Sequence, residues 1–172
     1  MASLIFTAFG ITPTTSSATG AVITIDYTYE ITLTTLDVHN QASEFLKFLI
    51  GTASAEITSS GIDYANGTVT MSDGTSVAIP GNAEVDVWGD DPGDRDDNLL
   101  ADDDDKRLSS QDPHAILCKT GTQTFTRSFT VVSRNLDEDW WSQDEIYLHL
   151  RVRFPALNLE AESAVVAGSW AG

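Results

Sequence analysis

The segment from Glu84 to Asp105 contains an unusual density of side chains that can bind cations. It holds ten aspartates and a single arginine, Arg95. Carboxylates this close repel one another unless water, salt or a bound cation relieves the repulsion. A second acidic stretch, residues 135–145, adds three aspartates and two glutamates. The two stretches together predict a site for a divalent cation.

Calcium suits this set of side chains better than magnesium. Ca²⁺ takes six to eight oxygen ligands, whereas Mg²⁺ requires tighter octahedral geometry and fewer protein carboxylates. Pro92-Gly93 would let the first stretch fold back, so that carboxylates before and after it share one ion. Glu138 and Glu145 could add bidentate carboxylates. The predicted Ca²⁺ ligands are Asp90, Asp91, Asp96, Asp97, Asp137, Asp139 and Asp144.

The stretch VDVWGDDPGDRDDNLLA, residues 85–101, resembles the third ligand loop of C2 domains, which are calcium-dependent, membrane-binding β-sandwiches. In that family a strand ending in Val-Trp or Val-Tyr leads into spaced aspartates and a Leu-Leu-Gly end. Val87-Trp88 and Leu99-Leu100-Ala101 match these two ends. The resemblance implies that Asp91, with Asp96 or Asp97, binds calcium.

The chain also departs from the C2 pattern. The family's first aspartate falls on Gly89, unless Asp90 takes its place by a shift of one residue. Ala101 replaces a glycine, and Asp37 is the one candidate for the family's other aspartate loop. Because the resemblance covers fewer than twenty residues, membrane binding is not inferred from it.

Two other interpretations of the acidic segment stay open. An EF-hand loop would have ligands at suitable positions, but Leu99 occupies its required glycine position and the flanking residues are not amphipathic helices. The segment could also be a solvated loop that only keeps the protein soluble.

Alternating apolar and polar residues predict an antiparallel β fold. Residues 10–20 read as a turn-rich connection. Helical spacing of Ala42, Phe45, Leu46 and Leu49 predicts one short helix at 40–50, capped by Asn40. The class is therefore an all-β sandwich, C2-like or jelly roll, with one domain spanning residues 1–172. Strands are predicted at 4–9, 22–35, 67–71, 75–79, 83–88, 122–134, 146–154 and within 157–170.

Some residues predict a surface for a partner. Trp140 and Trp141 in the second acidic stretch could anchor a ligand or a subunit, although at least one of them could instead cap the core. Arg151 and Arg153 lie on the outward face of the predicted strand 146–154, opposite in charge to most of the chain. That face could meet the acidic rim of a second copy, which predicts a homo-oligomer.

Composition excludes several functions. A formal net charge of -17 argues against nucleic acid and against anionic lipid, except through a calcium bridge. No transmembrane segment and no signal peptide is predicted, so the chain is expected to be soluble, and extracellular if the calcium site is real. The single cysteine, Cys118, reads as a small buried hydrophobe, and the three histidines show no metal-ligand spacing.

The leading hypothesis is a non-enzymatic, calcium-binding β-sandwich that acts as an interaction or structural module. Calcium would order the acidic loops 90–105 and 137–145 and create a contact surface. One alternative is a self-assembling subunit of a particle or filament whose acidic loops are only solvated. A second is a carbohydrate-active hydrolase, but an acid in such an enzyme needs an apolar pocket that hydrated aspartates do not provide.

Overall fold

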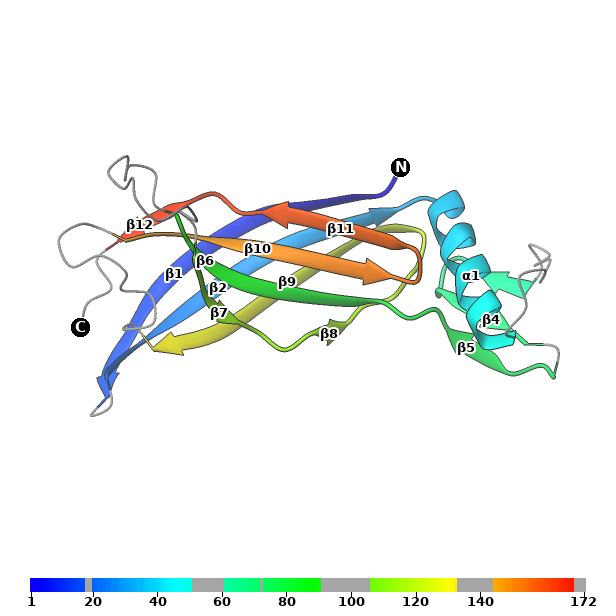
Figure 1. Cartoon of the computed structure of the whole chain (residues 1–172), viewed down its shortest axis with the longest axis horizontal. Coiled ribbons are helices and arrows are strands. Elements are labelled where there is room, and N and C mark those ends of the chain that lie inside the picture. The colour runs from blue at the N-terminus through cyan, green and yellow to red at the C-terminus, as the bar shows by residue number, and fades with distance from the viewer. Residues whose placement is uncertain (18–19, 51–60, 72, 91–105, 133–143, 169–172) are drawn as a thin grey trace, which may run out of the picture.

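The computed structural model describes residues 1–17, 20–50, 61–71, 73–90, 106–132 and 144–168. Most of these residues lie in antiparallel β-strands, and one α-helix crosses one end of the molecule (Figure 1). The predicted all-β class with a single helix is therefore confirmed at this level for the described residues.

Three long strands form the first sheet. They are β1 (Ser3–Ser17), β2 (Gly20–Leu33) and β9 (Gly121–Val132), in the order β1-β2-β9. The prediction that residues 10–20 form a connection was wrong, because β1 continues to Ser17 and pairs with β2 throughout. Pro13 is tolerated there because β1 is an edge strand, which pairs on one side only, so that a residue without an N–H need not interrupt the hydrogen bonds to β2.

The larger sheet has the order β11-β10-β6-β7. Its central strands are β6 (Asn82–Asp90) and β10 (Asp144–Phe154), which lie between β11 (Leu157–Glu162) and β7 (Lys106–Ser110). Two short strands complete it: β8 (His114–Ala115) pairs with β6, and β12 (Val166–Gly168) pairs with β10. Sequence patterning did not predict β7.

One hydrophobic core joins the two sheets. Every second residue of β2, from Ile23 to Leu33, is buried, as is every second residue of β10 from Ile146 to Phe154. This matches the predicted alternation. Each such side chain contributes about 1.5–3 kcal/mol through removal of apolar surface from water, so these two strands supply much of the driving force for folding.

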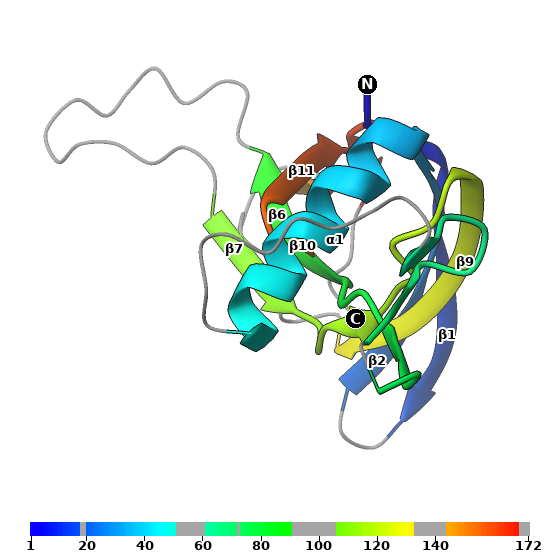
Figure 2. The same cartoon turned by 90° about the vertical axis from the view of Figure 1, so that its right-hand side faces the viewer.

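The helix α1 (Thr35–Ile50) begins five residues before the predicted start. Thr34, not Asn40, caps it: the Asp37 backbone N–H donates to the Thr34 hydroxyl (3.2 Å), and the Thr34 backbone N–H donates to the Asp37 carboxylate (2.9 Å). Val38, Ala42 and Leu46 are buried against the end of the sheets. Figure 2 shows the helix lying across that end.

A third, small sheet lies near the helix and consists of β3 (Ile62–Asp63), β4 (Thr68–Thr70) and β5 (Ser76–Ala78). The predicted Asp73-Gly74 turn joins β4 to β5, and the Met71 N–H donates to the Thr75 carbonyl (2.8 Å). Gly67, in the turn before β4, has φ +67°, and a Cβ there would lie 2.5 Å from the Cys118 carbonyl oxygen. The turn therefore packs directly on the chain at 118.

We expect G67A to lower the free energy of unfolding by at least about 3 kcal/mol, since it combines left-handed strain with a backbone clash. Gly74 is the matched control, because it has φ +85° but nothing within 4 Å of its added Cβ. G74A should lower the free energy of unfolding by only about 1–2 kcal/mol, which is the cost of the left-handed backbone strain alone. Urea denaturation would measure both, and equal losses would contradict the packing of Gly67 on residue 118.

Candidate functional site

The ladder between β6 and β10 joins the borders of the two acidic stretches. Asp90, the last residue of β6, is the Cα partner of Glu145. Asp144, the first residue of β10, pairs with Gly168 of β12. Residues directly opposite in an antiparallel pair have Cα atoms about 4.5–5.5 Å apart. The chain therefore enters segment 91–105 and leaves segment 133–143 at adjacent points of one sheet.

The start of the segment 133–143, where the chain leaves β9, lies at the same end of the molecule. β9 ends at Val132, which pairs with Val22 near the start of β2. In Figure 1, β6 and β9 both run away from α1, and β10 starts at the end where they finish. The strands that lead into the two acidic stretches therefore point the same way (Figure 1).

Most of the predicted ligands and both tryptophans of the second stretch lie outside the described residues. These are Asp91, Asp96, Asp97, Asp137, Asp139, Trp140 and Trp141. Asp90 and Asp144 are placed through their backbone in β6 and β10 only. Among the residues that the structure does describe, no three His, Cys, Asp or Glu side chains come together as a metal-binding group. The calcium ligands stay predictions.

Arg151 forms an ion-pair cluster with two carboxylates on the outer face of the larger sheet. Its Nη2 lies 2.6 Å from Oδ2 of Asp86 and 3.2 Å from Oε1 of Glu84. Asp86 is only 1% exposed, whereas Arg151 keeps about a quarter of its side chain accessible. The guanidinium predicted to bind a partner thus compensates a buried carboxylate of its own chain. Arg153, two residues on, is exposed.

Sequence reasoning counted Asp86 in the acidic stretch and missed its pairing. In the β6–β10 register, Asp86 lies opposite His149 and Glu84 lies opposite Arg151, so Asp86 reaches Arg151 diagonally. The alternation of apolar and polar residues predicts only that these charged side chains face outward. Only the register identifies which cation each carboxylate meets.

We expect R151M to lower the free energy of unfolding by about 3 kcal/mol, because it removes the guanidinium that lies 2.6 Å from the buried Asp86 carboxylate. R153M removes the same charge from the exposed neighbour on the same face and should change stability by less than about 0.5 kcal/mol. Chemical denaturation of both variants would measure the difference. Comparable losses would show that the Arg151 cluster contributes nothing specific.

A partly buried polar pair lies at the margin of the aromatic part of the core. The Tyr29 hydroxyl and Nε2 of His114 are hydrogen-bonded at 2.5 Å, and Tyr29 stacks on Phe125 with ring centroids 5.1 Å apart. Burial, and secondarily the Arg127 charge, lowers the pKa of His114 below its ordinary value. Burial also raises the pKa of Tyr29 above its ordinary range. Both groups are therefore neutral at pH 7.

This pair predicts a loss of stability in mild acid. The unfolded chain takes up a proton at His114 near its ordinary pKa of about 6.5, before the folded chain does. Stability contributed by neutral His114 is thus complete above that pH and lost as pH falls below it. H114Q should flatten the fall in the urea midpoint between about pH 7.5 and 5.5. An unchanged slope would show that His114 does not titrate with folding.

The single cysteine has no catalytic character. Cys118 is fully buried, as predicted, and burial raises the pKa of its thiol to about 12. Thiolate, the nucleophilic form, is therefore almost absent at neutral pH.

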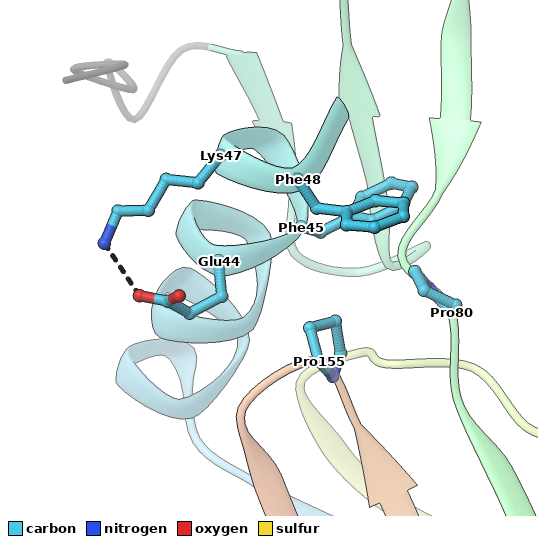
Figure 3. Close-up of a pocket in the computed structure, with 6 residues that line it drawn as sticks. All are labelled: Glu44, Phe45, Lys47, Phe48, Pro80 and Pro155. Atoms are coloured by element: carbon cyan, nitrogen blue, oxygen red, sulfur yellow. Dashed lines mark hydrogen bonds and ion pairs between the residues drawn. The ribbon is translucent and has the colours of Figure 1, made fainter. Parts of the chain in front are cut away.

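A pocket of about 530 Å³ opens between the last turns of α1 and the turns at Pro80 and Pro155 (Figure 3). Phe45 and Phe48 form its apolar wall. Its two charged side chains neutralise each other, since Lys47 Nζ lies 2.7 Å from the Glu44 carboxylate. The lining thus holds neither an unpaired charge nor an acid–base pair set in apolar surroundings, and it favours no reaction.

Comparison with known proteins adds no assignment: no family model and no curated protein sequence matches this chain. Across its described residues, α1 is the one helix, and no helix there has the length and apolar character needed to cross a membrane.

Proposed function

We propose that the chain is a non-enzymatic, calcium-binding β-sandwich that serves as an interaction or structural module. In this proposal the two larger sheets are the layers of the sandwich. The cation lies at the end where β6 finishes and β10 begins, and carboxylates of the two acidic stretches hold it. The bound ion would bridge the stretches and present a contact surface for a protein partner.

The register pair Asp90–Glu145 carries the proposal. It fixes the borders of both acidic stretches within one strand spacing of each other, so carboxylates from the two can reach a common ion. Ca²⁺ accepts oxygen ligands at about 2.3–2.6 Å and tolerates irregular geometry, which suits ligands drawn from two connections. A net charge of -17 further favours cation uptake.

The proposed site suits the calcium concentrations found outside cells. Extracellular calcium modules bind with dissociation constants of about 10⁻⁴–10⁻³ M, and we assign the proposed site to this class. Localisation outside the cell is therefore part of this proposal, and any lipid contact would pass through the bound calcium.

We expect calcium to raise the thermal midpoint and a chelator to reverse the rise. A ligand that binds only the folded state at a hundredfold excess over its dissociation constant stabilises by about 2.7 kcal/mol. The double variant D91N/D139N, with one substitution in each acidic stretch, should lose most of this gain. Scanning calorimetry with calcium, magnesium or chelator, together with calcium titration calorimetry, would measure the effect.

The matched control is D26N/D112N, which removes the same formal charge at two exposed aspartates outside both stretches. It should keep the calcium response, because general attraction to negative charge is equal in the two double variants. A midpoint insensitive to calcium in the parent chain would overturn the proposal. If both double variants lost the calcium response equally, the rise in the thermal midpoint would be explained by general charge screening and not by a specific site.

A second candidate is a self-assembling subunit whose acidic stretches serve only solubility. Exposed apolar side chains on α1 favour it: Leu36 is 67% and Phe48 83% exposed. Such surface is costly to leave in water and is often covered in an assembly. The calcium melt separates the candidates, since a plain subunit gains no stability from the ion.

A further inference from the structure

The strand β9 leaves one whole edge of the first sheet unpaired. Within the described residues its ladder runs to β2 alone, from Gly121 to Val132, and no strand pairs with its other side. Every second residue of this extended backbone thus directs its N–H and C=O groups to a side where no described strand lies. A strand edge of this kind is a template for another extended chain.

The opposite edge of the same sheet is protected, and β9 is not. β1 carries Pro13 and two register irregularities, and it lies against β11 of the larger sheet. Proline, bulges and covering elements are the usual devices that prevent edge pairing. β9 contains no proline, its ladder with β2 is regular, and Arg127 is its only charged residue.

Apolar side chains along β9 are incompletely covered. Phe125 and Phe129 pack against the core but are only partly buried, and Arg127 between them is exposed although it lies on the same inner face. The first half of β9 is better closed, because the Gln123 side-chain amide donates to the Leu117 carbonyl (2.8 Å). The open part of the edge therefore centres on residues 125–131.

Charge indicates what can approach this edge. Residues 113–132 contain no Asp or Glu, although the chain carries 26 of them and a net charge of -17. Lys119 and Arg127 make this segment locally positive. Two copies would repel across most of their surfaces, but least where β9 meets β9. An isologous contact of this edge also closes after two copies, because the joined sheet then has only the two protected β1 strands at its edges.

We infer that β9 pairs antiparallel with β9 of a second copy, which joins two three-stranded sheets into one of six strands. The inner side chains of both copies lie on the same face of the joined sheet only if the two-fold axis passes through a residue position of β9. An axis midway between two residues would bring inner side chains opposite outer ones. An axis at Arg127 would oppose two guanidinium groups, which is unfavourable. An axis at Ser128 places Arg127 against Phe129 of the second copy, a favourable cation–aromatic pair, and avoids the part of β9 near Leu117.

The mass of the full-length chain in chelator tests this inference, and it does so independently of the proposed calcium function. Light scattering should give twice 18.6 kDa, and S128K should give the monomer, because two lysines would then face each other at the axis. T28K adds the same charge on the central strand β2, on the same outer face of the sheet, and should stay dimeric.

A cysteine at the axis gives a second readout. S128C should form an oxidised dimer, since directly opposed Cβ atoms lie about 4.5–5.5 Å apart and small shifts bring them within disulfide reach. The native Cys118 is buried and T28C lies away from the edge, so neither should crosslink. A monomeric parent chain would overturn the inference, as would a dimer that S128K leaves intact.

Discussion

The antiparallel ladder between β6 and β10 is the constraint on which the rest of the molecule depends. Its inner face supplies Val85, Val87, Leu148 and Leu150 to the core, and all four are buried. Its outer face brings Arg151 to Asp86. Its far end holds Asp90 beside Glu145. Because side chains alternate with a period of two, a slip of one residue would expose the core and separate all of these pairs.

The two ends of the molecule differ in chemistry. At one end, α1 and the small sheet close the core with a capped helix and with a glycine turn that packs on residue 118. At the other end, three strand borders lead into or out of the acidic stretches. The borders of both acidic stretches thus lie at the end of the molecule away from α1 (Figure 1).

The two proposed interactions differ in physical origin. Cation binding would relieve repulsion among carboxylates, so it depends on ion concentration and on the acidic segments. Pairing through β9 would satisfy backbone groups and cover the partly buried rings of Phe125 and Phe129. The second interaction must overcome repulsion between two acidic chains, whereas the first is driven by the same charge. A molecule could therefore use either one alone.

The sequence by itself determined the β class, the inward faces of β2 and β10, the hairpin at Asp73-Gly74 and the burial of Cys118, because period-two patterning and turn chemistry are local. It placed the helix but missed its Thr34 cap, and it took residues 10–17 for a connection because threonine and proline serve both turns and edge strands. Only the tertiary structure decided that Asp90 lies beside Glu145, that Arg151 compensates Asp86, and that β9 is left unpaired. These facts follow from strand order and register, which depend on residues more than fifty positions apart and leave no local mark in the chain.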